Sequence, residues 1–265
     1  MTNQPIVWHY GLMAERWAKT INETPELAYF ERQIGRFGQP VLDLACGVGR
    51  LLMPLLRAGI AIDGCDISED MLAYPAARAG EEGLAAHLYA QQMHELDLPR
   101  RYKTIYICDS FGLSGSRAND LETLRRCYEH LQYGGALLFN IQPEYTSPED
   151  WAVWVPDGRS DLPEPWPEEG SRRTAADGSE NIAYFRSLEL DPLEQTFVNE
   201  VRLEKVVRGV IAATEQYTLK GNMYFKNEVL LMLQAAGFSD ISVTGDYSDQ
   251  PATSTSKEIL FTAIK

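Results

Sequence analysis

The stretch Val41-Leu-Asp-Leu-Ala-Cys-Gly-Val-Gly-Arg50 combines residues that could bind a ligand. An apolar run carries one acid, Asp43, and ends in two glycines, Gly47 and Gly49, which a single residue separates. Glycines at a strand end let the backbone approach a ligand closely, and free N–H groups at the following helix start can bind a phosphate or a carboxylate. Because a buried carboxylate needs partners, Asp43 should accept from backbone N–H groups or face a cationic ligand.

Two common glycine motifs do not fit this stretch. A dinucleotide site has Gly-x-Gly-x-x-Gly, and Leu52 stands where the third glycine would be. A phosphate-binding loop has Lys and Ser or Thr after its glycines, and neither follows here. The next apolar run ends in Asp66, roughly twenty residues further on, at the position that binds a ribose diol. Asp66 and the glycine pair together are more specific than the pair alone.

Strands and helices alternate around these residues. Apolar runs predict strands at 40–45, 60–67, 85–93, 102–109 and 134–141, and the segments 49–59, 68–83 and 119–131 between them predict helices, with Ser68 as a cap. This alternation indicates an α/β fold with a parallel sheet and helices on both faces. Ligands of such sheets bind beyond the carboxyl ends of the strands, which is where Asp66 and the glycines lie.

The rest of the chain divides by its pattern. The predicted parts are N-terminal helices over 1–36, the α/β core over 37–145, an antiparallel β insertion over 146–221, and a helix with a strand pair over 222–265. In the insertion, Phe197, Val201 and Leu203 share one strand face and Glu200 takes the other, with turns expected at 191–194 and 208–209. Because the insertion begins at the ligand edge of the sheet, we expect it to form a lid that governs substrate choice and not cofactor binding.

Composition limits the classes of function. The chain has 265 residues, 45% of them hydrophobic, and a net charge of -14, which disfavours nucleic acid and anionic membranes as partners. No apolar run approaches the roughly 18 residues that span a bilayer. Since no signal peptide is recognisable, a cytoplasmic location is expected. The four cysteines show no metal-ligand spacing, so no metal site is predicted.

The motifs resemble those of the class I S-adenosylmethionine-dependent methyltransferases. The resemblance covers roughly 37–141 and 222–265 and rests on VLDLACGVGR, GCDISEDML, AQQMHELDLP and ICDSFGL. It implies a seven-stranded, mostly parallel sheet with an antiparallel insertion after the fifth strand, S-adenosylmethionine as cofactor and S-adenosylhomocysteine as product. Ala45 replaces the first glycine of the usual motif, and Gln92 replaces the Asp that accepts from the adenine amino group.

The resemblance also implies particular site residues. Asp66 would hold the ribose, Ile67 and Met93 would line the adenine, and Asp109 would lie beside the methionine arm and the substrate. The predicted cofactor-binding residues are Tyr10, Asp43, Ala45, Cys46, Gly47, Gly49, Asp66, Ile67, Met71, Gln92, Met93, Asp109, Ser110 and Phe111.

The insertion is similar in placement to that of small-molecule N-methyltransferases. Alignment of the reactants can supply about 7–11 kcal/mol, whereas a general base usually adds roughly 10²–10⁴-fold in rate. Such an enzyme can therefore act without a dedicated base, and the predicted catalytic residues are His9, Tyr10 and Asp109. Because the sequence offers few candidate bases, an amine of a small-molecule substrate is favoured over a hydroxyl as the methyl acceptor.

Several alternatives stay open at this point. A small-molecule O-methyltransferase and a non-catalytic partner protein of the same fold both fit the motifs, whereas Leu52 disfavours an NAD-linked oxidoreductase. Trp151, Trp154 and Trp166 either wall the substrate site or pin a proline-rich loop onto the core. The sequence leaves open whether the protein is a monomer or a homodimer.

Overall fold

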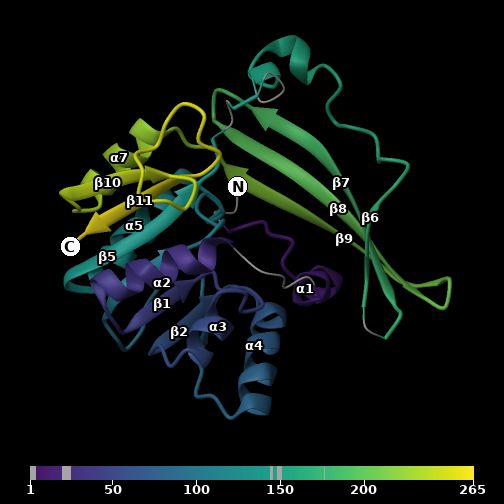
Figure 1. Ribbon diagram of the computed structural model, residues 1–265. Helices are drawn as coiled ribbons and strands as arrows, with labels where there is room; N and C mark the ends of the chain where they lie inside the picture. The colour runs from purple at the N-terminus through teal and green to yellow at the C-terminus, as the bar shows by residue number, and fades with distance from the viewer. Residues whose placement is uncertain (1–3, 20–24, 144–145, 148–150, 176) are drawn as a thin grey trace.

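The computed structural model describes residues 4–19, 25–143, 146–147, 151–175 and 177–265 (Figure 1). Its larger sheet has seven strands in the order β10-β11-β5-β4-β1-β2-β3. The strands are β1 (Val41–Leu44), β2 (Ile62–Asp66), β3 (His87–Ala90), β4 (Tyr102–Ile107), β5 (Leu131–Ile141), β10 (Asp240–Gly245) and β11 (Ile259–Ile264). Strands β1 to β5 are parallel, and β11 is antiparallel to both β5 and β10. The predicted mostly parallel, seven-stranded sheet is therefore confirmed.

Helices cover both faces of this sheet. They are α2 (Pro25–Phe37), α3 (Leu52–Arg57), α4 (Glu69–Glu82), α5 (Arg117–His130) and α7 (Lys226–Ala235), with short 3₁₀ turns η1 (Met93–Glu95) and η2 (Pro156–Arg159). Buried side chains of α2, α3 and α4 pack on one face with Val41 and Tyr106 of the strands. Those of α5 and α7 pack on the other face with Leu42 and Ile105. A parallel sheet covered on both sides in this way has continuous apolar strands.

The turn after β1 is held against α4. As predicted, the Ser68 side chain caps α4 by accepting from the Met71 N–H at 3.2 Å. Gly49 has φ +79°, and a Cβ on it would lie 2.9 Å from Cβ of Pro75 inside α4. Glycine at position 49 is thus needed because α4 approaches the backbone closely.

The insertion forms a separate antiparallel sheet in the order β6-β7-β8-β9. Its strands are β6 (Ser171–Thr174), β7 (Glu180–Asp191), β8 (Thr196–Val207) and β9 (Val210–Asn222). The predicted turns at 191–194 and 208–209 lie at the β7–β8 and β8–β9 connections. This second sheet extends away from the core sheet as a long curved hairpin array (Figure 1).

The face of the second sheet that carries Glu200 is also covered. Glu200, predicted to lie opposite the face of Phe197, Val201 and Leu203, is only 8% exposed. It forms an ion pair of 2.6 Å with Arg186 and accepts from Gln216. The guanidinium groups of Arg186 and Arg202 lie 4.3 and 5.0 Å from the Trp166 ring centroid, so the loop that carries Trp166 covers this face. Trp166 therefore pins the loop onto the second sheet, and not onto the core as the second of the two roles considered for the tryptophans would have it.

Helix α1 (Gly11–Ala18) lies between the core and the second sheet (Figure 1). Leu12 packs with Leu203 of β8 in one buried cluster, and Ala14 packs with Met71 of α4 in another. The segment before it, residues 5–10, is named here the N-terminal strap. Its Ile6 carbonyl accepts from the Lys220 N–H of β9 at 2.9 Å.

Carboxylates from the core and from the second sheet accept hydrogen bonds from the first N–H groups of α1. The Gly11 N–H donates to Oδ2 of Asp70 in α4 at 2.8 Å, and the Leu12 N–H donates to Oε2 of Glu215 in β9 at 2.6 Å. The first N–H groups of a helix have no partner within the helix, and negative charge is favourable there. Core and insertion thus hold the same helix end.

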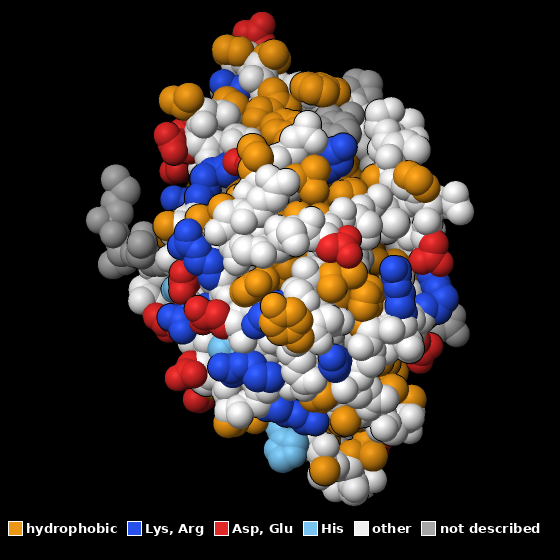
Figure 2. All heavy atoms as spheres, turned by 90° about the vertical axis from the view of Figure 1, so that its left-hand side faces the viewer, with side chains coloured by type: hydrophobic (Ala, Val, Ile, Leu, Met, Phe, Trp, Pro, Cys, Tyr) orange, Lys and Arg blue, Asp and Glu red, His pale blue; other side chains and the backbone are white. Residues whose placement is uncertain are grey.

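The face of the molecule in Figure 2 carries mixed charge. On the face shown in Figure 2, Lys and Arg side chains are interspersed with Asp and Glu side chains and with hydrophobic ones. Such mixing keeps this face from presenting a field of one sign. Among the residues that the structure describes, no helix is long and apolar enough to cross a membrane.

Candidate functional site

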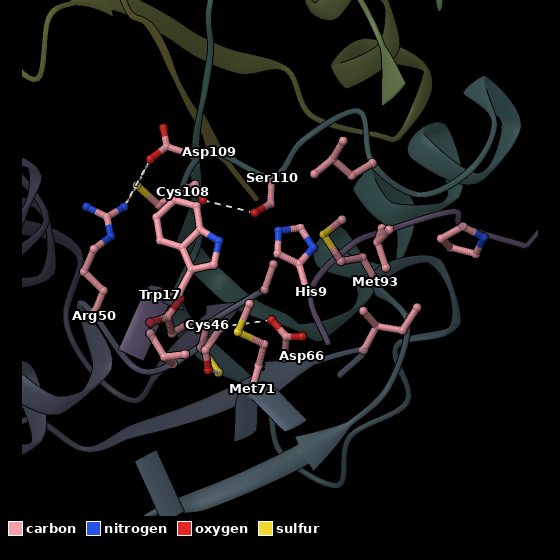
Figure 3. Close-up of a pocket in the computed structure, with 18 of the residues that line it drawn as sticks. His9, Trp17, Cys46, Arg50, Asp66, Met71, Met93, Cys108, Asp109 and Ser110 are labelled. Atoms are coloured by element: carbon pink, nitrogen blue, oxygen red, sulfur yellow. Dashed lines mark hydrogen bonds and ion pairs between the residues drawn. The ribbon is translucent and has the colours of Figure 1, made fainter. Parts of the chain in front are cut away.

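A cavity of about 380 Å³ lies at the carboxyl ends of the core strands (Figure 3). This volume lies within the roughly 300–1,000 Å³ typical of small-molecule sites. Its lining comes from the N-terminal strap, α1, α2, the glycine turn, and the ends of β2, β3 and β4. The lining residues are Pro5, Val7, His9, Trp17, Glu26, Asp43, Ala45, Cys46, Gly47, Val48, Arg50, Leu51, Asp66, Ile67, Met71, Gln92, Met93, His94, Cys108, Asp109, Ser110, Leu113 and Ser114.

The glycine turn and Asp66 form one unit. The Gly47 N–H donates to Asp66 Oδ2 at 2.9 Å, and the Ser68 N–H donates to Oδ1 at 2.8 Å. Burial raises the pKa of Asp66, while the N–H donors of Ser68 and Gly47 oppose that rise. Each carboxylate oxygen keeps a further lone pair with which it can accept from a ligand. Gly47 has φ +53°, and no atom lies within 4 Å of the place that a Cβ would take. The turn therefore leaves open space beside a hydrogen-bond acceptor.

A second acid lines the cavity beneath this turn. Asp43 is 3% exposed. Burial raises its pKa to about 7, and the neighbouring charge of Asp66 acts in the same direction. A cation placed in the cavity would favour the ionised form of Asp43. Both kinds of partner expected for Asp43, a backbone N–H and a positive charge, are near it, since Arg50 and the backbone of Leu52 act to lower its pKa.

The β3 side of the cavity is apolar with one free acceptor. Ile67, Met71 and Met93 supply apolar surface. Gln92 donates through Nε2 to Oε1 of Gln4 at 2.9 Å. Its own Oε1 is buried and has no hydrogen-bond partner among the described residues. Since buried polar atoms are usually paired, this oxygen is placed to accept from a ligand.

The β4 side carries a charged group. Arg50 Nη2 lies 3.1 Å from Asp109 Oδ2, and Arg50 Nη1 lies 3.0 Å from Glu26 Oε2 of α2. Asn140 of β5 donates to Asp109 Oδ1 at 2.7 Å and accepts from the Asp109 N–H at 2.8 Å. Ser110 follows and donates to the Cys108 carbonyl at 3.2 Å. Asp109 is thereby held at the strand end in a fixed orientation.

Two rings from the N-terminal region face the cavity. Figure 3 shows His9 and Trp17 between Asp66 and Met71 on one side and Asp109 and Ser110 on the other. Burial lowers the pKa of His9 to about 4, so its imidazole is neutral near pH 7. The backbone carbonyl of His9 accepts from the Ser68 hydroxyl, which ties the N-terminal strap to α4.

Most of the predicted site residues line this cavity, but Tyr10, Gly49 and Phe111 do not. Tyr10 lines a neighbouring cavity that shares Pro5 and Val7 with the first. Burial, together with the charges of Asp66 and Asp70, raises its pKa. Phe111 packs in the core, with its ring centroid 4.6 Å from that of Phe139, and Gly49 serves the contact with α4.

Several lining residues were not predicted. Arg50 ends the glycine motif and was read only as part of the turn, because its partners Glu26 and Asp109 come from distant parts of the chain. Trp17 of α1 and His94 of η1 also line the cavity, and neither is among the predicted site residues. Aromatic and charged types close to a ligand motif are the only sequence signal that these three residues offer.

Comparison with known proteins agrees with the observed fold. The structure has the fold of class I S-adenosylmethionine-dependent methyltransferases. Residues 41–135 match the model of a family described as methyltransferase domain. This part of the chain is therefore similar to a methyltransferase domain.

Relatives and solved structures extend over nearly the whole chain. A putative methyltransferase of Geobacillus sp. (strain WCH70) is 27% identical over 97% of this chain and 99% of its own. The CcbJ methyltransferase of Streptomyces caelestis has a TM-score of 0.71 and 16% identity, with coverage of 100% of this chain and 99% of its own. The sugar N-methyltransferase KedS8 of Streptoalloteichus sp. ATCC 53650 has a TM-score of 0.64 and 18% identity, with 96% and 88% covered. At these identities the two structures show the fold.

Proposed function

We propose that the protein is an S-adenosylmethionine-dependent methyltransferase that methylates an amine of a small molecule. The proposal rests on the groups that lie along one edge of the cavity. There, the open space at Gly47, the carboxylate of Asp66 and the unpartnered oxygen of Gln92 follow β1, β2 and β3, which are neighbours in the sheet.

The lining residues fit this cofactor. Asp66 would accept from the ribose hydroxyls, and Gln92 Oε1 from the adenine amino group, between the apolar side chains of Ile67 and Met93. S-adenosylmethionine supplies a methyl group on a sulfonium, from which a nucleophile can take it directly. Asp43, Asp66 and Asp109 would provide the negative surroundings that such a cation favours. The protein would then hold the reacting groups in line and exclude water from them.

The state of the candidate bases supports an amine acceptor. A neutral His9 with a pKa of about 4 is a weak base at neutral pH. Tyr10, whose pKa is raised mainly by burial, stays protonated and cannot accept a proton. Asp109 is already paired with Arg50. An amine, which is nucleophilic once neutral, needs less help than a hydroxyl. The sugar N-methyltransferase among the solved structures of the same fold is in keeping with this choice.

Thermal melts and methyl transfer test the proposal. S-adenosylhomocysteine at 100 times its dissociation constant should stabilise the fold by ~2.7 kcal/mol, and NAD should not. Labelled S-adenosylmethionine should then methylate small amines in preference to small alcohols. Stabilisation by NAD alone would contradict the proposal, and transfer confined to alcohols would replace the amine by a hydroxyl.

A further inference from the structure

A second cavity, of about 590 Å³, lies between the N-terminal strap and β9. One wall is the strap with Tyr10, and the other includes three consecutive residues of β9, which are Gln216, Tyr217 and Thr218. Neighbouring side chains of a strand point to opposite faces of the sheet. Three consecutive residues therefore line one cavity because it lies along the edge of the strand, and β9 is an edge strand of the second sheet.

The edge of β9 directs backbone groups into this cavity. The Lys220 N–H points away from β8, since it donates to the Ile6 carbonyl of the strap at 2.9 Å. In an antiparallel pair, residues bonded to the partner strand alternate with residues whose N–H and C=O groups point outward. The register between β8 and β9 is regular over this part of β9. Gln216 and Thr218 therefore also point their N–H and C=O groups outward.

The strap leaves these backbone groups unpaired. It is bonded to β9 at Lys220, and the helix start that follows it is bonded to Glu215. Between these two points, no backbone hydrogen bond joins the described residues of the strap to Gln216 or Thr218. The second cavity occupies the gap. An unpaired strand edge of this kind is a template on which another extended chain can add as a strand.

The dimensions of the second cavity suit a short peptide. Gln216 and Thr218 are two residues apart, which is about 6.6 Å along a strand. An extended peptide repeats its own outward groups at the same interval, so two or three residues can pair with this edge. The cavity volume of about 590 Å³ lies within the range typical of small-molecule sites. Both cavities share Pro5 and Val7, so one end of such a peptide can reach the first cavity.

The weak bases near the first cavity favour an amine that is already neutral. The α-amino group of a peptide has an ordinary pKa of about 7.7–8.0, whereas that of a lysine side chain is about 10.4. At pH 7.5, roughly a third of the α-amino groups are therefore neutral, against about one in a thousand lysine side chains. His9, with a pKa of about 4, and the protonated Tyr10 are poor acceptors for the proton of an ammonium. A peptide amine needs this help least.

We infer that the second cavity binds a short peptide as an added strand on the edge of β9, and that the terminal amine of this peptide is the methyl acceptor. This inference rests on the proposed function. The Thr218 N–H would donate to a peptide carbonyl, and the Thr218 carbonyl would accept from a peptide N–H. In the reaction, the amine nitrogen forms a bond to the methyl carbon, and the sulfonium sulfur keeps the electron pair of the bond that breaks. The methylated ammonium then loses a proton to water.

Methyl transfer to two pools of tripeptides tests the inference from the side of the ligand. One pool consists of tripeptides with a free amino terminus, and the other consists of the same tripeptides methylated on both amide nitrogens. Labelled S-adenosylmethionine should methylate the first pool at least roughly tenfold faster, because the second pool has lost the N–H donors that pair with the β9 carbonyls.

Two proline variants test the inference from the side of the protein. Thr218→Pro removes one backbone donor from the second cavity and should lower kcat/KM for the ordinary tripeptides roughly tenfold. Thr214→Pro is the matched control, because Thr214 points outward on the same edge but does not line the second cavity. Proline is tolerated on an edge strand where the N–H faces away from the sheet. The affinity for S-adenosylhomocysteine should not change in either variant.

The outcomes are distinguishable. Absence of S-adenosylhomocysteine binding to wild-type protein would contradict the proposed function itself. If S-adenosylhomocysteine binds, then equal rates for the two pools or no transfer to the ordinary tripeptides would overturn the peptide site. Equal kcat/KM in folded Thr218→Pro and Thr214→Pro would also overturn it. If Thr218→Pro does not fold, the two pools decide with wild-type protein.

Discussion

At the scale of single residues, Asp66 has two tasks. It holds the N–H groups of Gly47 and Ser68 and, in the proposed function, also accepts from the ribose. Hydrogen bonds to a charged acceptor contribute about 1.5–3 kcal/mol each. Asp66→Ala should therefore weaken S-adenosylhomocysteine by roughly 10- to 100-fold or more, and it should also lower the melting temperature. Asp66→Asn should weaken binding less, because one acceptor remains. Calorimetry and thermal melts on both variants measure the two effects.

Asp63 on the same strand is a suitable control. It is 2% exposed and pairs with Arg100 and the Tyr102 hydroxyl, outside the cavity. Asp63→Asn should destabilise the fold and leave the affinity of the folded protein unchanged. Unchanged affinity in Asp66→Ala would speak against the cofactor assignment.

Asp43 makes stability depend on pH. Burial raises its pKa from an ordinary 3.8 to about 7, so between these values the folded state binds more protons at this site than the unfolded state. Stability from the protonated form is fully present below pH 3.8 and is lost as the pH rises through about 7. The free energy of unfolding should thus fall from pH 5 to 8 more steeply in wild-type protein than in Asp43→Asn. Denaturant titrations of both proteins across this range measure the difference. Parallel curves would mean that Asp43 does not titrate there.

At the scale of elements, α1 depends on acids that it does not contain. Glu215 accepts from the Leu12 N–H and from the Tyr217 hydroxyl, both through Oε2. Glu215→Ala removes the acceptor that the sheet supplies to the helix start. We expect a loss of roughly 1–2 kcal/mol in stability, as for a lost helix cap. Because α1 carries Trp17 into the cavity, S-adenosylhomocysteine should also bind more weakly.

Glu204→Ala provides the comparison for this variant. Glu204 pairs with Arg202 and Tyr184, both within the second sheet. This variant should change stability without changing affinity for S-adenosylhomocysteine. Equal affinities of Glu215→Ala and wild-type protein would show that the start of α1 does not influence the cavity.

The features that the sequence predicts well either lie within a short segment or follow from the geometry of parallel sheets. The glycine turn, Asp66 and the cap at Ser68 lie within short motifs, and strand ends of a parallel sheet meet at one edge. Arg50 was missed as a site residue because its partners come from α2 and β4. The burial of Glu200 could not be predicted, because nothing in its strand shows that the Trp166 loop covers its face. Both depend on contacts between segments far apart in the chain.

At the scale of the whole molecule, the expected role of the insertion in substrate choice stays a prediction, and the structure adds a connection from the insertion to the cavity. None of the described residues of β6 to β9 lines the cavity. Yet Leu12 of α1 packs against Leu203 of β8, while Trp17 of the same helix lines the cavity. The insertion therefore supports the cavity through α1, and it can affect cofactor binding without touching the cofactor.

Hydrogen exchange tests this indirect support. S-adenosylhomocysteine should slow amide exchange in α1 and in β8 around Leu203 severalfold, because a filled cavity holds α1 in place and local opening becomes rarer. Amide exchange in β10 should not change, because β10 is at the opposite edge of the sheet from β3, and α1 packs against α4, the helix between β2 and β3. Protection confined to the glycine turn and the ends of β2 and β4 would contradict the role of α1.

The hydrogen bonds that join α1 to both the core and the second sheet also bear on how two ligands affect each other's binding. The start of the helix is bonded to Asp70 of the core and to Glu215 of the sheet that would cover an acceptor. If binding of a methyl acceptor brings the second sheet closer to α1, the acceptor raises the affinity for the cofactor. The cofactor then raises the affinity for the acceptor by the same factor. Coupling of this kind usually amounts to about 5- to 150-fold. Each ligand would then bind more tightly in the presence of the other than alone.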